Sequence, residues 1–339
     1  MIHDVLKRLV RREDLSETEM AAVMTEVMSG NATDAQIGAL MAALACKGET
    51  FTELAGAARA MRRKAARIQV TAETVVDTCG TGGDSANTFN ISTTAAFVVA
   101  GCGVTVAKHG NRSVSSKSGS ADLLEALGVK LDVTPEVVEE AIGEIGIGFL
   151  FAPVFHGAMK HAARARKEVG MRSIFNMLGP LTNPAGANCQ LLGVYAPELT
   201  EMFAEALRLL GARRAFVVHG HDGLDEISAC APTRISELKD GMIRTYDVTP
   251  EQFVGRRAEA KDLQGGLPAD NASITWRILA GSEQGAKRDV VVMNAAAALV
   301  AAGAAKDFSE GVVRAQESID GGAAFAKLEG LVRYTNENG

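Results

Sequence analysis

The chain has 339 residues, of which 41 are acidic and 35 basic, so its formal net charge at pH 7 is −6. Hydrophobic residues make up 47% and charged residues 22%, the balance of a soluble globular protein with enough length for a large core. The net negative charge argues against general binding of nucleic acid or an anionic membrane surface, but it leaves room for a local basic pocket that binds an anionic small molecule.

Three short helices are predicted in the first 70 residues, each from the same signature. Each begins with a hydroxyl residue followed three positions later by Glu or Gln, a spacing at which the two side chains cap the helix start: Ser16 with Glu19, Thr33 with Gln36, and Thr50 with Glu53. Gly30 and Gly48 end the first two helices, and the third runs toward Arg67. Short connections between capped helices predict a small all-helical unit.

From Val70 onward, short apolar runs alternate with helical stretches. The predicted strands are residues 75–76, 104–107, 149–151, 191–195 and 215–218. The predicted helices are residues 97–100, 121–127 and 199–210, with further helical stretches at 291–302 and 308–331. This alternation predicts an α/β fold with a central, largely parallel sheet.

A glycine-rich loop follows the first predicted strand. Residues 80–84 read Gly-Thr-Gly-Gly-Asp, so several backbone N–H groups can turn toward one point and bind an anion such as pyrophosphate. A Walker loop would end in Gly-Lys-Ser/Thr, and a dinucleotide-binding loop would need a third glycine where Ser85 stands. Taken alone, the loop is also compatible with a plain glycine turn.

Two more polar loops follow the next helix and strand boundaries. Residues 90–93, Asn-Ile-Ser-Thr, precede an apolar helix whose N-terminus can bind phosphate, although Ser92 or Thr93 could simply cap it. Residues 108–112, Lys-His-Gly-Asn-Arg, follow a strand at the edge where open α/β sheets bind ligands. A hydroxyl-rich stretch comes next: Ser113, Ser115, Ser116, Ser118 and Ser120. Three such loops in succession indicate a phosphate site.

These motifs, in this order and spacing, closely resemble those of anthranilate phosphoribosyltransferases. The resemblance also includes residues 118–122, 175–176, 178–184, 222–226, 288–289 and 294–296, and spans most of the chain. Members of that family join anthranilate to phosphoribosyl pyrophosphate and release pyrophosphate, a step of tryptophan biosynthesis. The resemblance therefore implies this reaction, with these two small molecules as the binding partners.

The resemblance also implies a division into domains. A small helical domain would comprise residues 1–70 together with about 165–185, and it would form the interface of a homodimer. The larger α/β domain, residues 71–164 and 186–339, would bind phosphoribosyl pyrophosphate. The same fold is shared with pyrimidine nucleoside phosphorylases.

The resemblance assigns the site residues one by one. The implied substrate-binding residues are Gly80, Thr81, Gly82, Gly83, Asp84, Thr88, Asn90, Ile91, Ser92, Thr93, Lys108, His109, Gly110, Asn111, Arg112, Ser113, Ser116, Ser120 and Arg166. Catalytic roles are implied for Lys108, Asn111 and Arg166. The implied cofactor is Mg²⁺, with Ser92, Asp225 and Glu226 as its ligands, because Mg²⁺ prefers carboxylate, phosphate and water oxygens.

Arg166 has the chemistry that an acceptor carboxylate needs, since a guanidinium binds a carboxylate through two parallel hydrogen bonds. The alternative is a surface arginine on a helix over residues 157–169. Family members often have proline where Gly157 and Arg164 stand, so the start of this helix can differ and Arg164 can compete for the carboxylate. For Asp225 and Glu226, the alternative is a solvated turn.

The five cysteines are odd in number, widely spaced and without a C-x-x-C pair, so neither a disulfide framework nor a structural zinc site is predicted. A reducing cytosol is the simplest setting, and a cytoplasmic location is expected. The N-terminus lacks the apolar segment of a signal peptide, and the longest run of small apolar residues, 295–305, is too short to cross a membrane. Neither membrane nor nucleic acid is expected as a partner.

Two alternative functions stay open at this point. A pyrimidine nucleoside phosphorylase would share the fold and the glycine loop, but Asp84, the 108–112 motif and the acidic pair favour the transferase. A non-catalytic nucleic-acid-binding relative would have a basic surface and degraded substrate motifs, whereas this chain is acidic and its motifs are intact.

Overall fold

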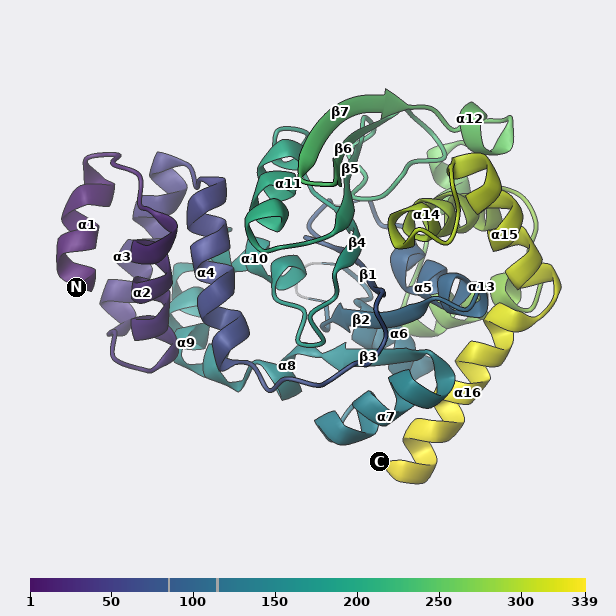
Figure 1. The fold of residues 1–339 in the computed structure, drawn as a ribbon, viewed down its shortest axis with the longest axis horizontal. Coiled ribbons are helices and arrows are strands. Elements are labelled where there is room, and N and C mark those ends of the chain that lie inside the picture. The colour runs from purple at the N-terminus through teal and green to yellow at the C-terminus, as the bar shows by residue number, and fades with distance from the viewer. Residues whose placement is uncertain (85, 114–115) are drawn as a thin grey trace.

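The computed structural model describes residues 1–84, 86–113 and 116–339, so Ser85 and Ser115 of the motifs above lie outside the described residues. A group of helices forms one end of the molecule, and a sheet with helices packed on both faces forms the rest (Figure 1). No helix among the described residues combines the length and apolar character needed to cross a membrane.

The N-terminal unit contains four helices: α1 (Ile2–Val10), α2 (Glu17–Met28), α3 (Asp34–Lys47) and α4 (Phe51–Lys64). The three predicted capping boxes are confirmed, because Ser16, Thr33 and Thr50 each exchange hydrogen bonds with the residue three positions later. Helix α1 was not predicted, and no side chain caps its N-terminus. Buried Glu53 also accepts from the Leu15 N–H at 3.0 Å and so joins α4 to the start of α2.

The sheet has seven strands in the order β3-β2-β1-β4-β5-β6-β7. They are β1 (Val75–Gly80), β2 (Thr105–Gly110), β3 (Ile147–Phe151), β4 (Cys189–Gly193), β5 (Arg214–Gly220), β6 (Thr233–Lys239) and β7 (Met242–Val248). The first five strands pair in parallel and the last two add antiparallel, which confirms the predicted largely parallel sheet. All five predicted strands are present.

The antiparallel hairpin β6–β7 was not predicted, although the sequence carries its signal. Asp240 and Gly241 form the two-residue connection, and both have positive φ, at 52° and 76°. A two-residue Asp-Gly loop with both residues in this region is a preferred hairpin turn, since its twist matches that of the strands.

Helices cover both faces of the sheet. They are α5 (Ile91–Gly101), α6 (Ser120–Ala126), α7 (Pro135–Ile145), α8 (Ala152–Phe155), η1 (Gly157–Met159), α9 (Lys160–Val169), α10 (Ile174–Leu178), η2 (Gly179–Leu181), α11 (Leu199–Leu209), α12 (Glu251–Val254), η3 (Ala260–Leu263), α13 (Pro268–Leu279), α14 (Ala286–Ala302), α15 (Phe308–Asp320) and α16 (Ala323–Asn338). The single helical stretch expected over 308–331 is two helices, because Gly321 and Gly322 separate them and Gly322 has φ +75°.

The two faces bury different cores. Phe216 and Val218 of β5 pack with α5 and α14, whereas Ala215 and Val217 pack with α11 and the N-terminal helices. This alternation follows from the two-residue period of a strand. Helices α9 and α10, far from the N-terminus in sequence, contribute Ala165 and other buried residues to the same core as α2 to α4. The segment that carries Arg166 therefore packs against the N-terminal helices.

The parallel strands decide where the site lies. Strands β1, β2, β4 and β5 end at Gly80, Gly110, Gly193 and Gly220, and the carboxyl ends of parallel strands meet at one edge of the sheet. The polar loops at 80–84 and 108–112 leave this edge directly.

Gly56 offers a test of how closely the N-terminal helices pack. A Cβ at this position of α4 would lie 2.3 Å from the Glu17 carbonyl oxygen of α2, so Gly56→Ala forces the two backbones apart. We expect a loss of about 1–3 kcal/mol in the free energy of unfolding, measured by urea denaturation. Gly143→Ala in α7 is the matched control, because nothing lies within 4 Å of its added Cβ, and it should gain about 0.5–1 kcal/mol. Equal effects of the two substitutions would contradict the close approach of α2 and α4.

Candidate active site

The glycine loop is anchored to the end of β4. The Thr81 N–H donates to the Gly193 carbonyl at 2.9 Å, and the Tyr195 N–H donates to the Thr81 hydroxyl at 3.2 Å. Beyond this anchor, Gly82 and Gly83 have φ of +66° and +82°, a conformation that side chains rarely adopt. The loop therefore needs glycine at both positions to turn its N–H groups together.

The acidic pair lies against this loop. Asp225 Oδ2 accepts from the Gly82 N–H at 2.9 Å, and Glu226 Oε1 accepts from the Ser92 N–H at 3.1 Å. Burial raises the pKa of the Asp225 carboxyl, with a further contribution from Asp84; burial also raises the pKa of the Glu226 carboxyl, with Asp225 adding to it. The pair thus joins the glycine loop to the start of α5 and is not a solvated turn.

Glycines and an asparagine hold the acidic pair in place. A Cβ on Gly193 would lie 1.5 Å from the Asp225 carbonyl oxygen, so the two backbones touch directly. On the other side, buried Asn294 of α14 accepts from the Ile227 N–H at 2.9 Å and donates to the Ile227 carbonyl at 3.0 Å. This explains why the Asn294 motif accompanies the acidic pair in the sequence.

Helix α5 begins at Ile91, with Asn90 at its N-cap, so the alternative in which Ser92 or Thr93 caps the helix is wrong. The Asn90 side chain donates to the Ser118 carbonyl at 3.0 Å and accepts from the Ser118 hydroxyl at 3.1 Å. Ser92 is half-buried in the first turn, while Thr93 is buried. Thr88 forms an isolated bridge with Gln264 just before this turn.

Lys108 lies inside the protein beneath the glycine loop. Its Nζ donates to the Thr78 carbonyl of β1, and burial lowers the pKa of the ammonium, opposed by Asp77 and other acidic neighbours. Buried Asp77 accepts from the His109 N–H at 3.2 Å and from the Asn183 side chain at 2.8 Å. Burial raises the pKa of Asp77 to about 6. Lys108 is therefore buried beside β1, and its Nζ is bonded two residues before the glycine loop begins.

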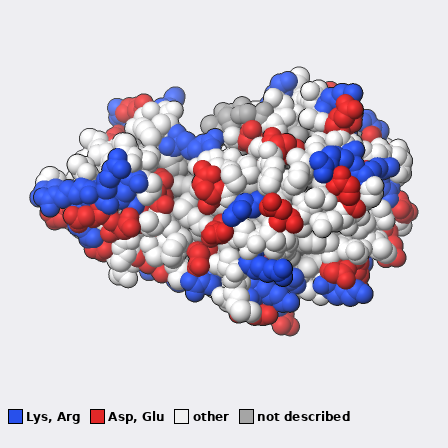
Figure 2. Space-filling model, turned by 90° about the horizontal axis from the view of Figure 1, so that it is seen from above, with Lys and Arg blue, Asp and Glu red and all other residues white. Residues whose placement is uncertain are grey.

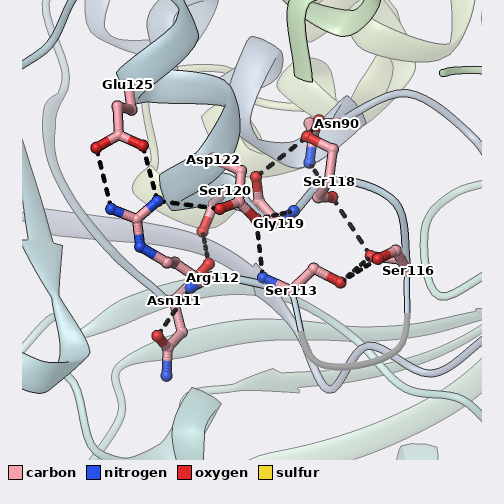
Figure 3. Close-up of polar contacts among 10 residues, drawn as sticks. All are labelled: Asn90, Asn111, Arg112, Ser113, Ser116, Ser118, Gly119, Ser120, Asp122 and Glu125. Carbon is pink, nitrogen blue, oxygen red and sulfur yellow. Dashed lines mark hydrogen bonds and ion pairs between the residues drawn. The ribbon is translucent and has the colours of Figure 1, made fainter. Parts of the chain in front are cut away.

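The loop after β2 is held by carboxylates (Figure 3). Asp122 Oδ2 accepts from the backbone N–H groups of Ser113 and Gly119, both at 2.9 Å. The Arg112 guanidinium binds Asp122 at 3.1 Å and both oxygens of Glu125 at 2.8 and 3.0 Å. Arg112, predicted to bind substrate, is therefore engaged with α6 in this structure.

The remaining residues of this loop lie at its surface. Asn111 is exposed, and its carbonyl oxygen accepts from the Ser120 hydroxyl at 3.3 Å, while Gly110 leaves room for that hydroxyl. The hydroxyls of Ser113 and Ser116 lie 2.8 Å apart (Figure 3). These contacts bring the loops at 90–93, 108–113 and 116–122 into one group.

Two of the α9 arginines differ in their surroundings. Arg164 is 75% exposed and pairs with Glu168 at 2.8 Å and with Asp34 at 3.6 Å. Arg166 lies 5.4 Å from the centre of the Phe175 ring, and burial lowers its pKa. Among the described residues, Arg166 has no carboxylate partner, so its guanidinium is the one available to a ligand.

A buried pair of histidines was not singled out as a pair from the sequence. The His109 and His156 rings lie 5.0 Å apart, and His109 Nδ1 donates to the Gly179 carbonyl at 3.1 Å. Within the described part of the chain, neither Nε2 atom has a hydrogen-bond partner. Burial lowers the pKa of His109 to about 3 and that of His156 to about 4, so both rings are neutral. No sequence spacing links residues 47 positions apart, which is why the pair was missed.

Comparisons with known proteins show the family of the chain. Residues 72–325 match the glycosyl transferase family, a/b domain, and residues 3–65 match the helical bundle domain of the same family. The chain is 76% identical to the anthranilate phosphoribosyltransferase of Syntrophobacter fumaroxidans, over 100% of both chains. The chain belongs to the anthranilate phosphoribosyltransferase family. The membership predicted from the motifs is thereby confirmed.

Solved structures of the family agree in fold. The crystal structure of the Thermus thermophilus member has a TM-score of 0.94 at 46% identity, covering 98% of this chain and 99% of that one. The Saccharomyces cerevisiae member, in complex with PRPP and Mg, has a TM-score of 0.90 at 29% identity, covering 99% and 98%. Neither the phosphorylase nor the nucleic-acid-binding alternative is supported, and basic and acidic side chains are interspersed on the face seen in Figure 2.

The two depressed histidine pKa values make a prediction about acid stability. An unfolded histidine binds a proton near pH 6.5, whereas in the folded protein the pKa is about 3 for His109 and about 4 for His156. The unfolded state therefore binds more protons, and the folded state loses stability as the pH falls below 6.5. Each histidine should contribute about 1.4 kcal/mol per pH unit between pH 6 and 4.5. The slope is measured by urea denaturation across this range.

The double variant His109→Asn with His156→Asn should lower that slope, whatever its overall stability. His3→Asn, which changes an exposed histidine on α1, is the control and should leave the slope as it is. A double variant with the wild-type slope would show that the pair does not titrate on unfolding.

Proposed function

We propose that this chain transfers the phosphoribosyl group of phosphoribosyl pyrophosphate to the amine of anthranilate and releases pyrophosphate. The observation that carries the proposal is the meeting of the three polar loops at one sheet edge, with the acidic pair bonded to the glycine loop and to the start of α5. Family membership supports the same reaction. Tryptophan biosynthesis is the pathway in which this product is used.

The donor phosphates bind at the three loops. The glycine loop at residues 80–84 and the N-terminus of α5 bind the diphosphate, because a glycine-rich turn and the positive end of a helix dipole both attract anions. Hydroxyls and amides at positions 88–93, 111–113, 116 and 120 surround the ribose and its phosphate. Lys108 adds positive charge from beneath the sheet edge.

The reaction breaks the bond from the ribose carbon to the pyrophosphate oxygen and forms a carbon–nitrogen bond on the opposite side. Positive charge develops on the ribose while negative charge grows on the leaving pyrophosphate, so catalysis depends on alignment and on stabilising that anion. The amine of anthranilate is unprotonated at neutral pH, so its nitrogen attacks without a strong base. Arg166 binds the anthranilate carboxylate and orients the amine, while Asn111 lies between the two substrates.

Mg²⁺ fits the donor atoms present. Asp225 and Glu226 bring two carboxylates to the glycine loop and the start of α5, and Ser92 adds a hydroxyl beside Glu226. The described residues contain no group of three His, Cys, Asp or Glu side chains that could hold a metal ion. Substrate phosphates and water would supply the remaining ligands, as is usual for Mg²⁺. The bound ion would neutralise charge on the pyrophosphate.

The proposal includes the division into domains that the family resemblance implies. The helical domain comprises residues 1–70 with about 165–185, supported by the packing of α9 and α10 against α2 to α4. Residues 71–164 and 186–339 form the donor-binding domain. The helical domain provides the homodimer interface, and the enzyme works in the cytoplasm.

The reaction itself is tested by the loss of anthranilate fluorescence when phosphoribosyl pyrophosphate is added. We expect rapid loss with Mg²⁺, stoichiometric release of pyrophosphate, and no loss with a chelator, because the acidic pair binds the diphosphate only through a cation. Folded protein without turnover would contradict the proposal. Phosphorolysis of a pyrimidine nucleoside, or retention on heparin at physiological salt, would then point to the alternatives.

Arg166→Ala tests the acceptor assignment. Loss of a charge-assisted hydrogen bond costs about 1.5–3 kcal/mol, so the KM for anthranilate should rise about 10- to 150-fold while the KM for the sugar donor changes little. Arg164→Ala is the matched control on the same helix, because its side chain is exposed and paired with Glu168. Equal effects of Arg166→Ala on both substrates would contradict the assignment.

A further inference from the structure

A four-residue connection, Gly170 to Ser173, joins α9 to α10, and both of its ends are fixed. Gly170 ends α9 in the left-handed conformation, with φ +63°. The Ser173 N–H donates to the Asn176 side chain at 3.0 Å, which defines the start of α10. The side chain of Arg172 therefore leaves this connection from a constrained backbone.

Arg172 reaches the tip of the glycine loop. Its Nη2 donates to the Gly83 carbonyl at 3.1 Å, and its guanidinium carbon lies 3.8 Å from the centre of the Tyr195 ring. A Cβ on Gly83 would lie only 2.6 Å from Arg172 Nη2, so the glycine permits this approach. Arg172 forms no ion pair with any other described residue.

These contacts close a small cluster around the loop. Tyr195, on which Arg172 stacks, also donates through its backbone N–H to the Thr81 hydroxyl at 3.2 Å. The loop is thus held at Thr81 by the end of β4 and at Gly83 by an arginine from the α9–α10 segment. Stacking of a planar guanidinium on an aromatic ring restricts its orientation.

The bond to Gly83 controls the direction of a neighbouring N–H. In a trans peptide the carbonyl and the following N–H point in opposite directions. When Arg172 binds the Gly83 carbonyl on one side, the Asp84 N–H must point to the other side of the peptide plane. The arginine thereby selects one orientation of a loop amide, and its charge lies beside the place where the diphosphate binds.

The same short segment carries the proposed acceptor residue. Arg166 lies in the last turn of α9 and over the ring of Phe175, which belongs to the first turn of α10. Arg166 and Phe175 thus flank the connection from which Arg172 extends. The segment that carries Arg166 is thus joined through Arg172 to the glycine loop.

We propose that Arg172 is a positioning residue that couples the two substrate sites, holding the glycine loop in the conformation that binds the diphosphate when the acceptor segment is occupied. The inference rests on the proposed function. Coupling of this kind is reciprocal, so each ligand raises the affinity for the other by the same factor.

The coupling is measured with a pair that cannot react, pyrophosphate with Mg²⁺ and anthranilate, by calorimetric titration of the full-length protein. With wild-type protein, saturating anthranilate should tighten pyrophosphate binding by about fivefold or more, the low end of typical couplings. The coupling ratio is the Kd for pyrophosphate without anthranilate divided by the Kd with it. With Arg172→Ala this ratio should fall to less than about twofold, because the link between the α9–α10 segment and the glycine loop is lost. Arg164→Ala is the matched control and should keep the wild-type ratio.

A second pair of variants tests the stack without touching the arginine. Tyr195→Phe keeps the ring and should keep the coupling ratio, whereas Tyr195→Leu removes the ring and should lower it. A wild-type ratio near one, or an Arg172→Ala or Tyr195→Leu ratio equal to that of wild type, would overturn the inference. These outcomes leave the proposed function intact as long as wild-type protein turns over anthranilate, and only loss of that turnover contradicts the function itself.

Discussion

The contact between one carboxylate oxygen and one backbone N–H determines how the site is assembled. The hydrogen bond from the Gly82 N–H to Asp225 Oδ2 joins the loop after β1 to the loop after β5, although the two residues are 143 positions apart in the sequence. Glycines make the contact possible, because a side chain at Gly80 or Gly193 would collide with Asp225. The hydrogen bond from the Ser92 N–H to Glu226 then holds the start of α5 against both loops.

A second polar network connects the sheet edge to the segment that carries Arg166. Asp77 receives hydrogen bonds from both β2 and Asn183, and Asn183 also donates to the Ala107 carbonyl at 2.8 Å. His109 adds its bond to Gly179. The chain between α10 and β4 is therefore fixed by buried hydrogen bonds to the sheet edge where the glycine loop begins, and the segment that carries Arg166 leads into it.

Local signals made the N-terminal helices and the parallel strands predictable. A capping box such as Ser16 with Glu19 involves residues three positions apart, and the apolar strands needed only their own sequence. The glycine loop was identified from its own residues and the acidic pair through a resemblance to a family, but their direct contact depends on packing between distant elements. The role of Asn294 in holding Ile227 and the bond from Arg172 to Gly83 have no local signature, so only the folded chain reveals them.

The carboxylate in the glycine loop has a consequence for selectivity inside a cell. Free phosphate is abundant there, and an open nest of N–H groups would bind it. Here the Asp225 carboxylate already accepts the Gly82 N–H. A free anion would have to displace this side chain from the loop and would be repelled by its negative charge. The diphosphate proposed above would arrive with its own cation, which would give Asp225 a new partner when the Gly82 N–H is released.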